Sequence, residues 1–461
     1  MCLLTELPYR EDSAQLFNAI AARPWAVFLD SGHPLAHGGR YDILAADPYV
    51  TLCTFGDITE ITDRHGTRRS TNDPFELLRE TLGELTENHS GLPFCGGALG
   101  WFGYDLGRRI EVLPTLAEDA EALPDMAVGI YDWAVVVDHE SKRCWLVGQG
   151  RATSTRRRWW ELLRMFSKPA AEPRLPPFGV TSEVNSNMSR QQYGEAFARI
   201  KRYIHDGDCY QVNFAQRFAA TAEGDSWHAY RRLRQLNPAP FSAFIRTPYG
   251  QALSSSPERL LQLKDRLVET KPIKGTRPRG DTAEADSSLA MELSQSRKDQ
   301  AENLMIVDLL RNDISRVCCS GSVRVPKLFD IESYATVHHL VSTVNGKLQQ
   351  DKDALDLVRA CFPGGSITGA PKIRAMQIIE ELEPHRRGLY CGSIAYIGFD
   401  GQMDSNITIR TLIYNQGVIR CWAGGGIVHD SLVDEEYQET FDKAAAMLRL
   451  LQPQELVDVG A

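Results

Sequence analysis

The sequence predicts an α+β protein whose sheets are largely antiparallel. Apolar runs of strand length cluster in the first 150 residues, amphipathic helical segments cluster further along, and the regular strand–helix alternation of a parallel sheet is absent. A chain of 461 residues can bury a large core. Its 43% hydrophobic and 24% charged residues are typical of a soluble globular protein.

The first 168 residues are expected to form a β-rich region. Short apolar runs between Gly, Pro and Asp predict strands at Trp25 to Leu29, Ile43 to Ala46, Val50 to Phe55 and Val135 to Val137. Four prolines between positions 169 and 179 indicate a linker, which we place at 169–187. A second region then spans 188–453.

Local signals also predict a helix and a hairpin in the second region. Ser189 and Gln192 form a capping box, apolar residues follow at helical spacing, and Gly207 ends the helix. The turn Asp400-Gly401 joins strands expected at Ile394–Phe399 and Ile407–Thr411.

Charge and composition argue against several classes of protein. A net charge of -9 and a pI near 5.7 are unlike those of a nucleic-acid-binding surface. No apolar stretch reaches the roughly 18–20 residues of a membrane span, and the first residues lack the features of a signal peptide. The ten cysteines include no CxxC pair. We therefore expect a cytoplasmic protein with reduced thiols and no nucleic-acid or membrane partner.

The run Cys361 to Met376 (CFPGGSITGAPKIRAM) is the most informative segment. A Gly-rich turn before a helix N-terminus lets backbone N–H groups approach an anion. Ala370 and Pro371 stand where a Walker loop needs Lys and Ser or Thr, so a nucleotide triphosphate is not expected. Taken alone, the run also fits an ordinary turn before a helix.

Two predicted helices each carry acids three residues apart. Asp299 and Glu302 lie in one helix, and Glu436 and Glu439 lie in the other. Residues at this spacing are neighbours on a helix surface. Two such helices facing one another would offer oxygen ligands to a hard cation such as Mg²⁺. For either pair alone, a solvated helix face is the simpler interpretation.

Single polar residues at predicted turns and strand ends add to these signals. If Lys274, in PIKGT, is buried, its pKa falls and its amine becomes a nucleophile. Glu258 can act as a general acid. Arg410, expected to end a strand, can bind a carboxylate with help from Tyr390. Each position alone also fits a turn or surface residue.

Two further features precede or follow predicted strands. Gly424, Gly425 and Gly426 end a strand expected at Val418–Ala423, where a ligand can approach the backbone closely, although a flexible turn fits as well. His339 precedes an apolar strand, where a buried structural histidine is more common than a catalytic one.

Together these segments resemble the chorismate-utilising enzymes. The similarity covers nearly the whole chain and is strongest from Cys209 (CYQVNFAQRF) to Lys443 (YQETFDK), with GYDLGRR at 103–109 and LPDMAVGIYDW at 123–133 matching in the N-terminal half. The resemblance implies a layered α/β sandwich of two large antiparallel sheets flanked by helices. Residues 1–168 would be interleaved with a chorismate-binding catalytic region at 188–453.

The resemblance also implies roles for the candidate residues. Mg²⁺ would be held by Glu302 and Glu439, with Glu436 and Asp299 as supporting acids, and would meet one carboxylate of chorismate. His339 would lie beside the ring and assist proton transfer or orientation. The rest of the substrate would contact Arg410, Tyr390, Gly275, Thr276, Ser366 and the backbone of Gly424, Gly425 and Gly426.

Two positions indicate the branch of the family. Similar anthranilate synthases carry Ala at the position of Lys274, and isochorismate and salicylate synthases carry a Lys base at that of Gln211. Lys274 with Gln211 therefore implies formation of 4-amino-4-deoxychorismate, on the para-aminobenzoate route to folate. In the implied mechanism Lys274 attacks ring carbon 2, Glu258 protonates the leaving hydroxyl, and ammonia then displaces the lysine. The alternative is anthranilate synthase component I.

The resemblance implies two partners besides chorismate. Ammonia is expected from a separate glutamine amidotransferase subunit, because the chain shows no Cys-His-Glu glutaminase pattern. The family also has a tryptophan pocket, and the matching positions are Ser31, Pro240, Phe241 and Ser242, although core packing explains Phe241 equally well. A catalytically inactive tryptophan-binding regulator is a further alternative, which the intact acids and Lys274 disfavour.

Overall fold

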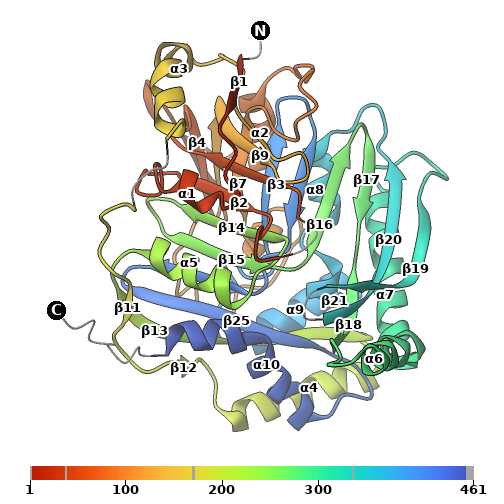
Figure 1. Cartoon of the computed structure of the whole chain (residues 1–461). Helices are drawn as coiled ribbons and strands as arrows, with labels where there is room; N and C mark the ends of the chain where they lie inside the picture. The colour runs from red at the N-terminus through yellow and green to blue at the C-terminus, as the bar shows by residue number, and fades with distance from the viewer. Residues whose placement is uncertain (1–2, 37–38, 169–171, 335–336, 453–461) are drawn as a thin grey trace.

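The protein is built around two large antiparallel sheets (Figure 1). The structure is a computed structural model, and it describes residues 3–36, 39–168, 172–334 and 337–452. Pro169 of the predicted linker and residue 453, the predicted end of the second region, lie outside the described residues. Every strand pair that forms either sheet is antiparallel, from β1 and β10 at one end of the first sheet to β5 and β6 at one end of the second.

Within the described residues the first sheet has 13 strands. Their order is β1 (Leu3–Leu7), β10 (Arg143–Gly148), β9 (Trp133–Asp138), β3 (Tyr41–Ala45), β2 (Val27–Asp30), β14 (Phe241–Arg246), β15 (Gln251–Ser256), β24 (Thr411–Asn415), β25 (Val418–Ile427), β13 (Gln211–Glu223) and β11 (Gly179–Val180), with β12 (Asn185–Ser186) and β21 (Gly369–Ala370) also paired to β13.

The second sheet has 12 strands over the same described ranges. Their order is β18 (Ile273–Pro278), β20 (Val337–Lys347), β17 (Leu267–Thr270), β16 (Arg259–Lys264), β23 (Met403–Asn406), β22 (Ser393–Gly398), β7 (Gly97–Phe102), β8 (Met126–Tyr131), β4 (Val50–Phe55), β5 (Ile58–Asp63) and β6 (Gly66–Ser70), with β19 (Arg324–Ser333) paired to β20.

Helices cover the two sheets. The elements beside the first sheet include α1 (Ala14–Phe17), α3 (Thr153–Phe166), α4 (Arg190–His205), α5 (Ser226–Leu236), α9 (Lys372–Leu382) and α10 (Val433–Leu451). Those beside the second include α2 (Pro74–Leu82), α6 (Ala283–Gln295), α7 (Arg297–Ser315) and α8 (Ala354–Cys361). Two short 3₁₀ turns, η1 (Tyr104–Arg109) and η2 (Gly365–Ile367), complete the elements.

The core is layered as the sandwich requires. One cluster of buried side chains, including Trp101 of β7, Val136 of β9 and Ile245 of β14, combines residues of both sheets and lies between them. Two other clusters join the sheets to their helices, one around Phe75 and the other around Trp227. The order from one surface to the other is helices, sheet, sheet, helices, which is the layered sandwich expected from the resemblance.

Strands from the two ends of the sequence alternate within each sheet. In the first sheet β2 pairs with β14, with Phe28 opposite Phe244. In the second sheet β7 pairs with β22, with Leu99 opposite Tyr396. The Pro-rich segment supplies β11 and β12, which pair with β13. The first 168 residues therefore contribute strands to both sheets instead of folding over one sheet of their own.

Several local predictions are confirmed. The predicted strand at Val50–Phe55 has the bounds of β4, and the runs near 25, 43 and 135 become β2, β3 and β9. The capping box of Ser189 and Gln192 begins α4, and Gly207, with a φ of 84°, follows its end. The Asp400-Gly401 turn does join a hairpin, between β22 and β23.

Four predicted strand boundaries are wrong in ways that affect the site. The predicted strand Ile407–Thr411 does not exist: β23 ends at Asn406, residues 407–410 cross to the other sheet, and β24 begins at Thr411. The glycines 424–426 lie inside β25 instead of after it. Likewise His339 lies inside β20, and Lys274 inside β18 instead of in a turn. In each case pairing with a distant strand decides the boundary.

Within the described residues no helix is both long and apolar enough to cross a membrane. Nine cysteines lie in this part of the chain, and all are free thiols.

Candidate active site

A bulge in β18 sets the direction of the Lys274 side chain. Ile273 pairs with Val341 and Thr276 pairs with His339, so Lys274 and Gly275 together oppose a single residue of β20. Gly275 has a φ of 80°, which a side chain would strain. Such bulges re-aim side chains, and they are common beside active sites.

Lys274, Ser366 and Glu258 form a hydrogen-bonded series. The Lys274 amine donates to the carbonyl oxygen of Ser366 at 3.4 Å, and the Ser366 hydroxyl donates to Glu258 Oε1 at 3.2 Å. Ser366 lies in η2, within the Gly-rich run, and Glu258 lies between β15 and β16. Three segments far apart in the sequence thus bring a candidate nucleophile and a candidate acid to the same place.

Burial shifts both titrating groups toward their uncharged forms. Burial of the amine and then the positive charge of Lys443 lower the pKa of Lys274, against the opposing effect of Glu302 and other acids. Burial also raises the pKa of Glu258, which is 7% exposed, and the neighbouring Lys274 charge only partly offsets this. A neutral amine and a protonated acid are the forms that nucleophilic attack and leaving-group protonation need.

The predicted metal acids come from α7 and α10. Burial raises the pKa of Glu302, and Asp299 and Glu439 raise it further, although Lys274 opposes them. Burial raises the pKa of Glu436 too, and the charge of Glu439 adds to it. Mutual repulsion among partly buried carboxylates is the electrostatic environment that a divalent cation relieves.

Glu436 has one carboxylate oxygen in use and one free. Its Oε1 accepts a hydrogen bond from Ser431 at 2.6 Å, whereas its Oε2 is buried without a hydrogen-bond partner among the described residues. A buried unpaired carboxylate oxygen is costly unless another group meets it. These donors fit a Mg²⁺ ion, although no group of three or more His, Cys, Asp or Glu converges on one point within the described residues. Mg²⁺ commonly completes its shell with waters and substrate oxygens.

Two of the three glycines of β25, Gly425 and Gly426, leave room for side chains of the site. A Cβ on Gly425 would lie 2.8 Å from Glu436 Oε2 and 3.4 Å from Glu439 Oε2. A Cβ on Gly426 would lie 2.7 Å from Gln211 Nε2. Gly425 and Gly426 are therefore needed because the acids and an amide occupy the space beside the strand, whereas a Cβ on Gly424 would meet the backbone oxygen of Phe214.

Arg410 is close enough to both Glu258 and His339 to interact with them electrostatically. The Nδ1 atom of His339 is 2.9 Å from the hydroxyl oxygen of Thr276. Burial, and then the charge of Arg410, lower the pKa of His339 to about 4, so the ring is neutral near pH 7. Burial lowers the pKa of Arg410, and within the described residues its guanidinium has no hydrogen bond or ion pair. A partly buried guanidinium with no carboxylate paired to it is suited to an anionic ligand.

Tyr390 is placed against aromatic and cationic neighbours. Its ring stacks on Trp422 at 5.7 Å between centroids, and the Arg387 guanidinium lies 5.5 Å from its centre. Burial raises its pKa well above the usual value. The structure thus packs Tyr390 in the core beside Trp422 and Arg387, and its role in binding a carboxylate stays a prediction.

Lys443 is a residue near the predicted metal acids that no sequence signal indicated. Its amine contacts Glu439 Oε1 at 2.6 Å and donates to the Gly424 carbonyl at 3.0 Å. It therefore joins the metal acids to the glycine strand and affects Lys274 electrostatically. The spacing Glu439–Lys443 is visible in the sequence but is also that of an ordinary surface pair on a helix.

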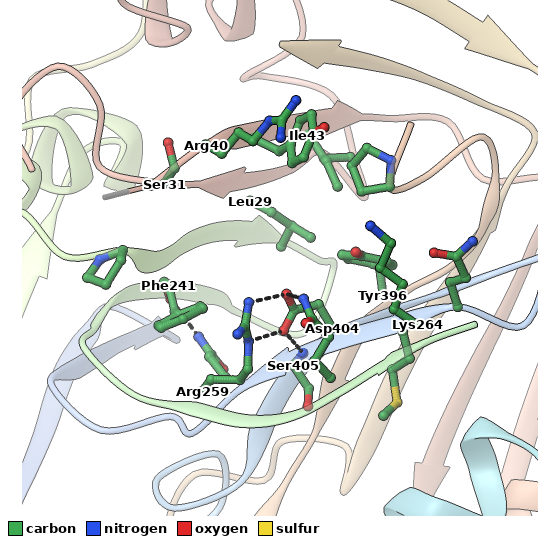
Figure 2. Close-up of a pocket in the computed structure, with 18 of the residues that line it drawn as sticks. Leu29, Ser31, Arg40, Ile43, Phe241, Arg259, Lys264, Tyr396, Asp404 and Ser405 are labelled. Carbon is green, nitrogen blue, oxygen red and sulfur yellow. Dashed lines mark hydrogen bonds and ion pairs between the residues drawn. The ribbon is translucent and has the colours of Figure 1, made fainter. Parts of the chain in front are cut away.

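A second candidate site is a cavity of about 530 Å³, which lies between β2, β3, β14, β16 and β23. All four residues of the predicted tryptophan pocket line it: Ser31, Pro240, Phe241 and Ser242. Figure 2 shows Phe241 beside Arg259, whose guanidinium lies 5.0 Å from the centre of the Phe241 ring and forms an ion pair with Asp404 at 2.9 Å. The cavity and the site around Lys274 are neighbours along the chain at the start of β16, because Arg259 of the cavity follows Glu258 directly.

The fold and the placement of these residues define a two-sheet enzyme scaffold with a lysine, acids and an unpaired arginine around one site. The chain belongs to the chorismate-binding enzymes, whose family model matches residues 38–449.

Relatives in this family carry two kinds of name. Aminodeoxychorismate synthase component 1 of Escherichia coli K12 is 51% identical over 450 residues, 97% of this chain and 98% of the relative. Anthranilate synthase component 1 of Acetivibrio thermocellus is 36% identical over 459 residues, 96% of this chain and 93% of the relative. The solved anthranilate synthase component I of Streptococcus pneumoniae TIGR4 matches with a TM-score of 0.80 and 33% identity, covering 89% of this chain and 92% of that one.

Proposed function

We propose that this protein converts chorismate and ammonia to 4-amino-4-deoxychorismate, as the name of its 51% identical relatives indicates for them. The observation that carries the proposal is the series Lys274–Ser366–Glu258. It brings an amine of lowered pKa and a carboxyl of raised pKa to one place. In the family pattern described above, anthranilate synthases carry Ala at the position of this lysine.

In the proposed first step the neutral amine of Lys274 forms a bond to ring carbon 2 of chorismate. The electron pairs of the ring diene shift toward carbon 4, and the hydroxyl there departs as water with the proton of Glu258. The proton lost by the newly bonded nitrogen returns to the Glu258 carboxylate. Ser366 supports both groups, since its carbonyl holds the amine and its hydroxyl holds the acid.

In the proposed second step ammonia replaces the lysine. Its lone pair bonds to carbon 4, the diene shifts back, and the bond between carbon 2 and the Lys274 nitrogen breaks. The incoming nitrogen loses one proton and the lysine leaves as a neutral amine, so the enzyme returns to its starting state. Net substitution of hydroxyl by amine at carbon 4 results.

Glu302, Glu439 and Glu436 would hold Mg²⁺, with Asp299 in support. The bound ion would supply a positive charge for one carboxylate of the substrate. Arg410 would bind the second carboxylate, supported by Tyr390, Lys443 and backbone N–H groups of Gly424, Gly425 and Gly426. Gly275, Thr276 and neutral His339 would line the ring and exclude water.

A glutamine amidotransferase subunit would deliver the ammonia, consistent with the words "component 1" in the names of the relatives. The cavity lined by Ser31 and Phe241 would bind tryptophan. Its volume lies in the range of small-molecule sites, and its aromatic and paired polar groups suit an amphipathic amino acid. Release of tryptophan from the denatured protein, detected by mass spectrometry, with its loss in Phe241→Ala, tests this assignment.

A product assay tests the proposed reaction. The protein is incubated with chorismate, Mg²⁺ and ammonium at alkaline pH, and products are separated chromatographically. We expect aminodeoxychorismate without pyruvate, and none in Lys274→Met. Anthranilate with stoichiometric pyruvate would establish the alternative anthranilate synthase activity instead.

A further inference from the structure

A single turn connects the glycine strand to the helix that carries two of the metal acids. It spans residues 428–432, between the end of β25 and the start of α10. Three backbone carbonyls of this turn accept hydrogen bonds from one amine, that of Lys201 on α4. The Lys201 Nζ lies 3.4 Å from the oxygen of Val428 and 3.2 Å from that of Ser431, and it also contacts the oxygen of His429.

The chemistry of this contact matches a monovalent cation in a carbonyl site. An ammonium group has three N–H donors and no acceptor, so three carbonyls satisfy it completely. Conversely, three carbonyl oxygens that converge in one turn repel one another unless a cation lies among them. Within the described part of the chain Lys201 forms no ion pair with a carboxylate, and its hydrogen-bond partners are these carbonyls; its amine also lies 5.9 Å from the centre of the Phe197 ring.

The turn that accepts hydrogen bonds from Lys201 also donates a hydrogen bond to Glu436. The hydroxyl of Ser431 accepts from the backbone N–H of Val428 at 3.1 Å and donates to Glu436 Oε1 at 2.6 Å. This bond leaves Glu436 Oε2 buried, unpaired and adjacent to Gly425. The positions of Val428 and Ser431 therefore decide where the free oxygen points.

We propose that Lys201 is a positioning residue for the metal site: its amine neutralises the carbonyls of the 428–431 turn and so fixes Ser431 and the Glu436 carboxylate. The inference rests on the proposed Mg²⁺ site but adds a residue on another helix that touches neither metal nor substrate. Groups that orient metal ligands in this way typically change affinity by about 10–100-fold when removed.

The test measures cation binding directly. Mn²⁺, as a stand-in for Mg²⁺, is titrated into the full-length protein and followed by the paramagnetic resonance of the free ion, with Mg²⁺ competition. We expect Lys201→Ala to raise the Mn²⁺ dissociation constant about tenfold. Arg202→Ala, on the same helix, removes an equal charge from an exposed position and should leave the constant unchanged.

Chemical rescue and hydrogen exchange make the result specific. Propylammonium should restore Mn²⁺ affinity to Lys201→Ala by entering the carbonyl site, and tetramethylammonium, which has no N–H donor, should not. Backbone exchange in residues 428–436 should rise in Lys201→Ala and fall again with propylammonium.

Three results would overturn the inference. An unchanged dissociation constant in Lys201→Ala would overturn it alone. Faster exchange in 428–436 with unchanged Mn²⁺ affinity would reduce Lys201 to a structural role. Failure of the unaltered protein to bind Mn²⁺ would overturn the proposed metal site, and this inference with it.

Discussion

The proposed role of Lys274 as a nucleophile depends on the balance of charges around its amine. Burial and Lys443 lower its pKa, whereas Glu302, Glu258 and Glu439 raise it. The lowering effects dominate, so the neutral amine is present at a lower pH than for an ordinary lysine. Each neighbouring charge can be removed separately by substitution, and each removal should shift the pKa of Lys274 in a known direction.

The first prediction concerns the direction in which two substitutions shift the pKa of Lys274. Lys443→Met should raise the pKa of Lys274, because it removes a positive charge that disfavours protonation, and Glu302→Gln should lower it. The measurement is the rate at which an amine-directed reagent labels Lys274 as a function of pH, followed by peptide mass spectrometry. The control is Lys264→Met, because Lys264 lines the cavity beside Phe241. Shifts in the same direction for both variants would refute the charge balance.

The second prediction concerns the acid stability of the fold. His339 has a folded-state pKa of about 4, below the ordinary 6.5. The unfolded chain therefore binds the proton first, and this group lowers the unfolding free energy as the pH falls from 6.5 toward 4. His339→Gln should lessen the loss between pH 7 and 4.5 by about 2–3 kcal/mol, measured by urea unfolding. His429→Gln, at an exposed position, should not.

Sequence signals identified some site residues and missed others for physical reasons. Lys274 and Glu258 stand in short motifs unusual enough to be noticed, and the structure joins both to Ser366. Lys443 was missed because a Glu–Lys pair four residues apart stabilises any exposed helix. Its importance comes from the Gly424 carbonyl, a contact between elements that the local sequence does not encode.

At the scale of elements, β25 shows why a glycine run in a strand is a feature of the site. Its glycines pair regularly with β13, Gly425 opposite Phe214, so the backbone is ordinary strand. What the glycines provide is space on both faces, filled by Glu436 and Glu439 on one side and Gln211 on the other.

The third prediction follows from that space. Gly425→Ala places a methyl group 2.8 Å from Glu436 Oε2, so the carboxylate must move. Because the oxygen ends a flexible side chain, the fold should tolerate the change, but displacement of about 1 Å in a site can lower turnover roughly 100-fold. Steady-state kinetics at varied Mg²⁺ and urea unfolding are the measurements.

The matched control for this variant is Gly179→Ala, where an added Cβ meets nothing within 4 Å. It should leave both turnover and stability near those of the unaltered protein. Full activity of Gly425→Ala would contradict the placement of Glu436 beside the strand.

Elements defined by local signals were predicted well, and those defined by tertiary pairing were not. The capping box of α4 and the strand β4 are determined by residues that are neighbours in the sequence. In contrast, Ile407 to Ile409 has the apolar character of a strand, but its backbone bonds go elsewhere: Ile407 donates to Glu258, and Thr408 accepts from Cys391. The positive φ of Arg410, 50°, then turns the chain into β24.

At the scale of the molecule, the two sheets are built from both ends of the chain. Removing residues 1–187 would leave β14 without β2 and β22 without β7. Such unpaired inner edges expose backbone groups and apolar faces that normally lie in the core. The resemblance indicated this interleaving, but neither composition nor periodicity specifies which distant strands pair.

The fourth prediction is that residues 188–461 alone do not form a stable fold. The fragment should lack cooperative urea unfolding and should aggregate, whereas co-expression with residues 1–187 should restore a soluble, cooperatively unfolding complex. A fragment with the near-ultraviolet dichroism and a sharp unfolding transition of its own would contradict the account of interleaved sheets.

The central claim is that the Lys274 amine bonds to the substrate ring. The most direct measurement is intact mass, followed by peptide mapping, of protein mixed with saturating chorismate and Mg²⁺ without ammonia and quenched within milliseconds. The account predicts an added mass of chorismate less one water, located on Lys274 and absent from Lys274→Met. Unmodified protein at every quench time, from a preparation that forms aminodeoxychorismate when ammonium is added, would contradict it.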